Sequence, residues 1–138
     1  MTGLHEALRA EHAVVFGYGV VGAHLGGRLL AVARKAEEAH RIRRDAVLDR
    51  LTSGRNAAPP AEPAYALPFP VTDRAGALKL AIHLEERAAA VWRAVLGGAR
   101  GADRQLALDA LVDSAVLATR WREFAGVPAT VPLPGTPA

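Results

Sequence analysis

Glycine and proline are clustered in this chain, and the clusters leave four long stretches in which nothing interrupts a helix. The breaks lie at Gly26-Gly27, in a proline-rich segment from Arg55 to Val71, at residues 97–101, and at Gly126 and beyond. The intervening stretches are rich in Ala, Leu, Arg and Glu, which favour helix over strand. The sequence therefore predicts an all-α fold with helices over about 4–25, 27–51, 72–96 and 102–125.

Length and composition are those of one globular domain. The chain has 138 residues, 51% of them hydrophobic, which is enough to build a core without covalent cross-links. It contains no cysteine, so disulfides and thiolate metal sites are excluded. We expect residues 1–138 to form a single domain, a four-helix bundle with an extended proline-containing tail.

Location and charge give three further expectations. The N-terminal residues lack the basic and apolar regions of a secretory signal, so we expect a cytoplasmic protein. The uncharged run Ala13–Gly27 is shorter than the about 20 residues that span a bilayer, so no membrane partner is expected. The net charge of +3 is small, and the basic run from His40 to Arg44 is interpreted as a solvated helix face, so we expect no nucleic acid.

Each predicted helix carries a heptad stripe of apolar residues that charged side chains interrupt near its middle. Folding each helical hairpin about its turn places Glu11 opposite His40, and Glu85 opposite Asp113. Helices two to four, of about 25 residues, are roughly 38 Å long, so these positions lie near half height. The pattern predicts a polar layer in the middle of an apolar antiparallel bundle. The interrupting residues, stripe by stripe, are Glu11, then Glu37, His40 and Arg44, then Glu85, then Asp113 and Arg120.

Glu37 and His40 are spaced i, i+3, so both project from one helix face. With Glu11 and Glu85 on other helices, this arrangement resembles the ferritin-like superfamily, whose dimetal bundles use a Glu from each of two helices and Glu-x-x-His from the other two. The fourth helix departs from this pattern. Asp113 stands where the second Glu-x-x-His would begin, and Val116 replaces its histidine.

A second resemblance covers nearly the whole chain. The strings Ala10-Glu11-His12-Ala13, His40 to Ala46, Pro63 to Pro68, and Trp121-Arg122 with its Pro-Gly-rich tail are similar to an uncharacterised ferritin-like family found mainly in actinobacteria. The resemblance implies a long crossover along the bundle between the second and third helices. The roughly 17 residues of the linker reach about 56 Å when extended, which is enough for that path, although the spacing also permits simple up-down-up-down winding.

Buried carboxylates need compensation, and the sequence offers two kinds. One is a metal centre in which Glu11, Glu37, Glu85 and Asp113 bridge iron or manganese and His40 is the nitrogen ligand. The other is an ion-pair network in which Arg44 and Arg120 turn inward onto the acids. We interpret the chain as a ferritin-like protein of uncharacterised activity with a degenerate dimetal site held by ion pairs. The alternatives are a carboxylate-bridged di-iron or di-manganese oxidoreductase and a basic DNA-binding bundle.

The first predicted helix is apolar on every side. Phe16 and Val20 lie off its inner stripe, whereas a helix of a solitary bundle normally shows a polar face to water. This predicts a homodimer through helix one. In the linker, Tyr65, Leu67 and Phe69 alternate, and we expect them to fasten the linker to the bundle.

Overall fold

The computed structural model describes residues 3–130 and 133–135, and the helices of that part of the chain confirm the all-α prediction. The helices begin and end within two residues of the predicted positions. The first ends at Ala23, two residues early, and the second continues two residues further, to Ser53. Their bounds are α1 (Leu4–Ala23), α2 (Gly27–Ser53), α3 (Arg74–Gly98) and α4 (Gly101–Ala125).

The helix ends follow from local chemistry. Asp73 caps α3, because its carboxylate accepts a hydrogen bond from the Gly76 amide at 2.8 Å. Gly27 has φ +57 as α2 begins, and Gly126 has φ +73 where α4 ends. Only glycine adopts this left-handed conformation without strain, so both breaks lie where the glycines predict them.

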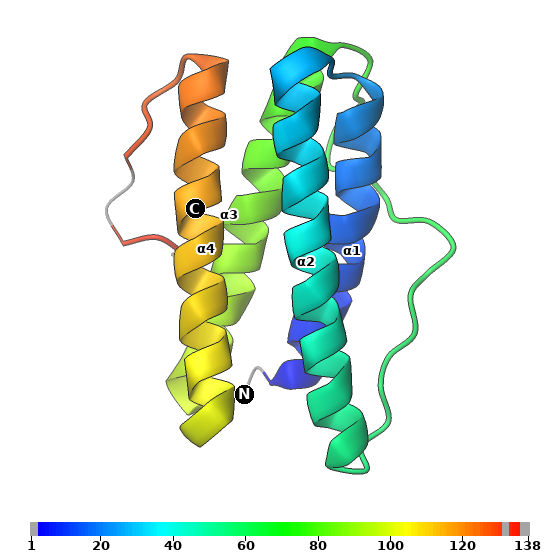
Figure 1. Ribbon diagram of the computed structural model, residues 1–138, viewed down its shortest axis with the longest axis vertical. Helices are drawn as coiled ribbons and strands as arrows, with labels where there is room; N and C mark the ends of the chain where they lie inside the picture. Colours follow the sequence, from blue (N-terminus) through cyan, green and yellow to red (C-terminus); the bar gives the residue numbers. More distant parts are fainter. Residues whose placement is uncertain (1–2, 131–132, 136–138) are drawn as a thin grey trace.

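The linker sets the topology. Figure 1 shows α1 running up the bundle, α2 and α3 running down it, and α4 running up again. Because α2 and α3 point the same way, the linker between Ser53 and Arg74 returns along the length of the bundle. The long crossover is therefore present, and up-down-up-down winding is excluded.

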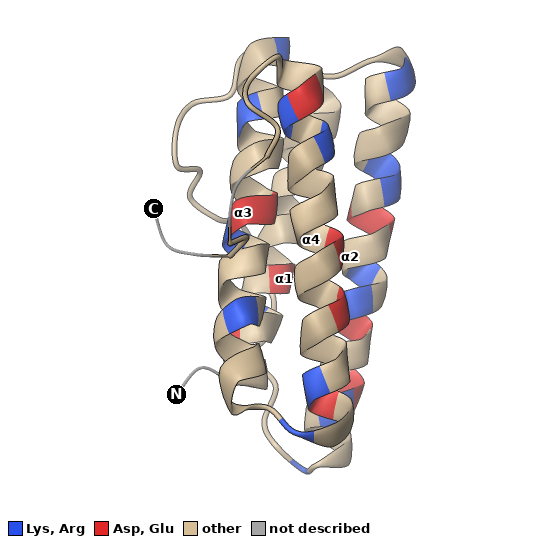
Figure 2. Ribbon diagram, turned by 90° about the vertical axis from the view of Figure 1, so that its left-hand side faces the viewer, with Lys and Arg blue, Asp and Glu red and all other residues tan. Residues whose placement is uncertain are grey.

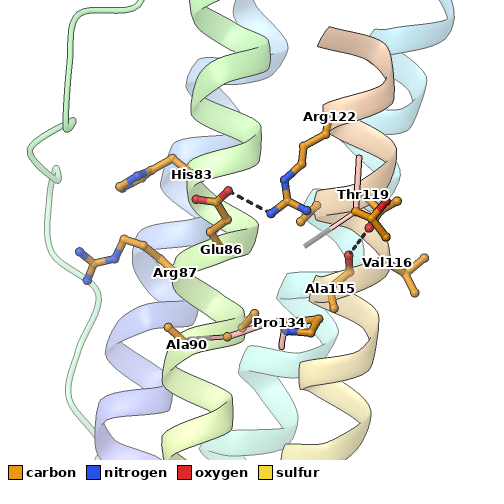
Figure 3. A pocket seen from close by; sticks show the side chains of 13 residues that line it. His83, Glu86, Arg87, Ala90, Ala115, Val116, Thr119, Arg122 and Pro134 are labelled. Atoms are coloured by element: carbon orange, nitrogen blue, oxygen red, sulfur yellow. Dashed lines mark hydrogen bonds and ion pairs between the residues drawn. The ribbon is translucent and has the colours of Figure 1, made fainter. Parts of the chain in front are cut away.

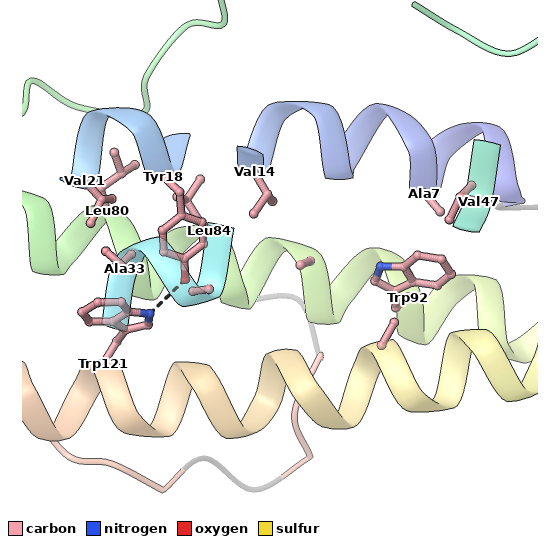
Figure 4. Packing of buried hydrophobic residues seen from close by; sticks show 14 of the residues in the cluster. Ala7, Val14, Tyr18, Val21, Ala33, Val47, Leu80, Leu84, Trp92 and Trp121 are labelled. Carbon is pink, nitrogen blue, oxygen red and sulfur yellow. Dashed lines mark hydrogen bonds between the residues drawn. The ribbon is translucent and has the colours of Figure 1, made fainter. Parts of the chain in front are cut away.

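The core lies between the four helices, and α1 and α3 form its centre. α3 packs closely against α4 and α1, and α1 against α2, whereas α2 and α4 approach each other much less closely. The largest fully buried side chains are Trp92, Trp121 and Tyr18, which lie among alanines, valines and leucines (Figure 4). Small residues predominate on the inner side of α4, where Ala107, Ala110 and Ala118 are buried.

The linker covers the outer side of α1. Tyr65 packs on Phe16 with ring centroids 5.5 Å apart, and His12 donates a hydrogen bond to the Pro59 carbonyl at 3.2 Å. Leu67 and Phe69 pack against the core. The alternating aromatic and apolar residues thus fasten the linker as predicted. Within the chain, the linker therefore covers Phe16, one of the residues on which the predicted homodimer through helix one depends.

The tail beyond Gly126 returns over α3 and α4 where it is described. Arg122 donates to the Ala129 carbonyl at 3.3 Å, and Arg93 donates to the Pro134 carbonyl at 3.0 Å. The rest of the expected extended tail, residues 131–132 and 136–138, lies outside the described residues. Across the described helices, no segment has the length and apolar character needed to cross a membrane.

We expect the substitution Tyr65→Ala to loosen the linker. It removes the ring contact with Phe16, and its cost in the free energy of unfolding should be about 1 kcal/mol. Urea denaturation measures that cost, and limited proteolysis should cut the linker faster in the variant. Ala64→Ser, at an exposed neighbouring position, is the control and should change neither; equal behaviour of the two variants would contradict the packing of Tyr65.

Candidate functional site

Three charged side chains from three helices meet in the middle of the bundle. His40 of α2 lies between Glu11 of α1 and Glu85 of α3. Its Nδ1 is 2.5 Å from Glu11 Oε2, and its Nε2 is 3.0 and 2.9 Å from the two carboxylate oxygens of Glu85. All three side chains are fully buried. The predicted contact between Glu11 and His40 is therefore present, and Glu85 joins it at the same height.

Donors from further residues complete the cluster around Glu11. Trp92 Nε1 donates to Glu11 Oε1 at 2.7 Å, and Arg43 Nη1 donates to the same oxygen at 3.2 Å. The Arg43 guanidinium also donates to Ser114 Oγ of α4 at 3.1 Å. Arg43 therefore connects the cluster to the fourth helix.

A second chain of donors ends at Glu85. The Tyr18 hydroxyl donates to Glu85 Oε2, and Trp121 Nε1 donates to the Tyr18 oxygen at 2.9 Å (Figure 4). The Tyr18 ring also stacks on the His40 ring, with centroids 5.7 Å apart. In the part of the chain that the structure describes, no buried side-chain nitrogen or oxygen lacks a hydrogen-bond partner.

The protonation states follow from this geometry. Burial alone would lower the pKa of His40, but its hydrogen bonds with Glu11 and Glu85 raise the pKa to about 9. Burial alone would raise the pKa of Glu11, yet the His40 and Arg43 charges and the Trp92 hydrogen bond bring it below its ordinary value. At neutral pH His40 is thus an imidazolium, and it lies with the Arg43 guanidinium beside the two buried acidic side chains, Glu11 and Glu85. Burial and the Glu85 carboxylate raise the pKa of Tyr18, which stays a neutral donor.

Two predicted ligands lie outside this centre. Glu37 is directed to the helix surface, where Arg41 lies 3.4 Å from its carboxylate. The Asp113 side chain is 69% exposed, and its nearest cation is Arg43 Nη2 at 3.7 Å. The structure therefore brings together Glu11, His40 and Glu85 and leaves Glu37 and Asp113 at the periphery.

The predicted cations are also displaced. Arg44 pairs with Asp45 at the surface, and Arg120 is exposed, so Arg43 takes the inward role instead. Successive residues of a heptad stripe are three or four positions apart. When a step of three comes where a step of four was predicted, the next buried residue is one position earlier in the sequence. The buried positions of α2 show this interchange and are Ala33, Ala36, His40, Arg43, Val47 and Leu51.

Sequence reasoning missed five members of the cluster. The stripes treat Tyr18 and Trp92 as part of the apolar core, and they place Arg44, not Arg43, on the inner side of the second helix. A buried Trp or Tyr normally places its polar atom on a partner, so their presence on stripes next to acids was the available signal. Ser114 and Trp121 lay off the predicted stripe of the last helix, and no pattern of that stripe indicated them.

The cluster does not fit a metal as it is arranged. Each His40 nitrogen faces a carboxylate at hydrogen-bond distance, so no free nitrogen lone pair is directed at a shared point. Arg43 and Trp92, which only donate, occupy Glu11 Oε1. Among the residues with described positions, no group of three His, Asp or Glu side chains has the geometry to hold a metal ion.

The cavities at the surface of the described part of the bundle include the two that follow. The larger, about 600 Å³, lies between α3 and α4 beside the tail. Figure 3 shows the Glu86–Arg122 pair, 3.0 Å apart, spanning it above Ala90 and Pro134. The smaller is a groove of about 370 Å³ between the upper halves of α2 and α4, with Arg120 on its rim.

Comparisons with known proteins agree with this description. The family model described as "Domain of unknown function (DUF4439)" matches residues 3–138. The crystal structure of a conserved hypothetical protein, rv2844, from Mycobacterium tuberculosis is similar to this chain, with 41% sequence identity and a TM-score of 0.85. The match covers 88% of this chain and 92% of that one. No curated protein matches the sequence.

The neighbouring arginines of α2 provide a test of the inner face. Arg43→Met should lower the free energy of unfolding by about 3–5 kcal/mol, because it leaves the Glu11–Glu85 pair with one buried cation. Arg44→Met, the matched control, loses only a surface pair and should change it by no more than about 0.5 kcal/mol. Urea denaturation of both variants measures the difference. Equal losses would show that Arg43 is not the internal counter-ion.

The free energy of unfolding should depend on pH through His40. Its pKa in the folded state, about 9, lies above the 6.5 of an unperturbed histidine, so its charge stabilises the fold fully below about pH 6.5. This stabilisation, about 3 kcal/mol, is lost as the pH rises through 9. Denaturation at a series of pH values measures the slope, which His40→Gln should lack. NMR titration of the imidazole gives an independent check, and a midpoint near 6.5 would contradict the prediction.

Proposed function

The chain belongs to the DUF4439 family of domains of unknown function, and we propose that it is a ferritin-like bundle protein whose central dimetal site is degenerate and held by ion pairs. In this proposal its activity is not oxidation at a metal. The ferritin-like assignment is supported by the long crossover between α2 and α3. It is supported as well by Glu11, His40 and Glu85, which meet at half height on three helices.

One observation carries the proposal: the His40 ring lies between two carboxylates and hydrogen-bonds to both. In a dimetal bundle, histidine and carboxylates are directed at the ions. Here an imidazolium stands between the acids, and Arg43 supplies the second positive charge. The charge that two metal ions would neutralise is already balanced by the protein's own side chains.

The centre then acts as a specificity element for the fold. A fully satisfied buried polar network is far more stable than the same groups partly unpaired. If one helix shifted along its axis, the cluster residue that it carries would move away from the residues on the other helices. We therefore infer that the cluster fixes the positions of α1, α2 and α3 along the bundle axis relative to one another. Arg43 and Trp121 extend this to α4 through Ser114 and Tyr18.

The oxidoreductase alternative requires a large rearrangement. Glu37 and Asp113 would have to turn inward from the surface, and Arg43 would have to leave. The DNA-binding alternative is disfavoured by pairing, because Arg41 and Arg44 of the basic run face acids on the same helix. Figure 2 shows acidic and basic segments interspersed along the lower part of α2, with no uniform basic track there.

Location and oligomeric state complete the proposal. We propose that the protein is cytoplasmic. A homodimer through α1 would form beside the linker, since Tyr65 covers Phe16 within the chain. The proposed function does not depend on that dimer.

Metal analysis tests the proposed function. Protein purified without chelator should carry far less than one equivalent of iron or manganese. Its unfolding midpoint should not change on adding either ion or EDTA, because no free ligand set stabilises the folded state with metal. About two equivalents of iron or manganese, as in a dimetal bundle, would overturn the proposal.

Surface variants make the metal analysis decisive. Glu37→Ala and Asp113→Ala remove carboxylates that contact solvent, so both should fold normally. In our proposal neither variant changes the metal content. If wild-type protein binds iron or manganese and either variant loses it, these residues turn inward and the oxidoreductase alternative is correct.

A further inference from the structure

The groove between α2 and α4 combines an apolar floor with a positively charged rim. Its lining from α2 includes Val32, Ala36 and Ala39, and Leu117 contributes from α4. Its charged lining residues are Arg28, Lys35 and Arg120, and no carboxylate lines it. Figure 2 shows the upper part of α2 carrying Lys and Arg before its first acidic segment.

These cations differ from the other basic residues near the middle of α2. Arg41 and Arg44 each face an acid of the same helix, and Arg43 pairs within the buried centre. Within the described part of the chain, Arg28, Lys35 and Arg120 form no ion pair with a carboxylate at 4.0 Å or less. Three unpaired cations around one apolar groove repel one another and favour an anion between them.

The groove exists because α2 and α4 stand apart. These two helices approach each other less closely than the other neighbouring pairs, and Arg43 crosses between them to Ser114. Above that crossing, the small side chains of Ala36 and Ala39 do not fill the space up to Leu117. A volume of about 370 Å³ lies at the small end of the range of ligand sites.

We propose that this groove binds a small amphiphilic anion, an alkyl carboxylate of medium chain length. The alkyl chain lies on the alanine, valine and leucine floor, and the carboxylate accepts charge-assisted hydrogen bonds from Lys35 and Arg120. The proposal is independent of whether the buried centre binds metal. The two experiments can therefore fail separately.

Octanoate is the probe, and 1-octanol and butyrate separate the two parts of the recognition. In titrations of ¹⁵N-labelled protein, octanoate should shift the amide signals of the groove residues, including Ala36 and Leu117. Octanol has the same chain without the charge and should bind about tenfold more weakly. Butyrate has the charge with four fewer methylenes, and its affinity should fall by about fourfold for each methylene lost from the floor.

Charge variants test the rim. Lys35→Gln combined with Arg120→Gln should weaken octanoate binding by about tenfold or more and leave octanol binding unchanged. The matched control, Arg34→Gln combined with Arg74→Gln, removes the same charge from exposed positions outside the groove. It should bind octanoate like the wild type.

A filling variant tests the floor. Ala39→Leu places a larger side chain in the groove at an exposed position, so the fold should be unaffected and both octanoate and octanol binding should be lost. Ala94→Leu, exposed on α3 and outside the groove, is its control. The proposal is overturned if octanoate shifts no groove amide, if octanol binds equally well, or if either control variant weakens binding as much as its partner.

Discussion

Charge balance in the interior is the constraint on which the rest of this structure depends. Two carboxylates, Glu11 and Glu85, are fully buried, and an ionised carboxylate without a partner in such a place costs several kcal/mol. His40 and Arg43 supply two positive charges within hydrogen-bond distance of them. Because the four groups come from three helices, the requirement acts between helices. The heights of α1, α2 and α3 are thus coupled by electrostatics as well as by apolar packing.

The aromatic residues of the core contribute more than volume. Trp92 and Tyr18 fill space among alanines and leucines, while an indole N–H and a phenol O–H are directed at the two buried acids. An indole nitrogen can only donate, so Trp92 stabilises the Glu11 carboxylate and would oppose a metal ion at the same oxygen. Trp121 then satisfies the Tyr18 oxygen. This arrangement suits acids neutralised by protein groups and does not suit acids that bridge metal ions.

Sequence patterns predicted the architecture more completely than the site. Glycine and proline located four helices, and the hairpin geometry placed Glu11 opposite His40, as the structure shows. The heptad patterns failed where two consecutive residues of a helix could each lie on its buried face. A heptad stripe is compatible with either Arg43 or Arg44 inside, and the partners that hold Arg43 there, Glu11 and Ser114, lie on other helices that the stripe does not describe. The donor roles of Trp92 and Tyr18 depend on side-chain direction, which spacing along a helix does not specify.

The exterior of the protein carries an excess of positive charge. The chain has 14 Asp and Glu against 17 Lys and Arg; with Glu11, Glu85, Arg43 and Arg122 buried, 12 acids and 15 basic residues lie outside the interior. The exterior therefore keeps the excess of three positive charges that the whole sequence has. Part of this excess lies around the groove between α2 and α4, where Arg28, Lys35 and Arg120 form no ion pair with a described carboxylate. Because the acids of the interior are neutralised by His40 and Arg43, these surface cations are not drawn inward and can attract an anionic molecule to the groove.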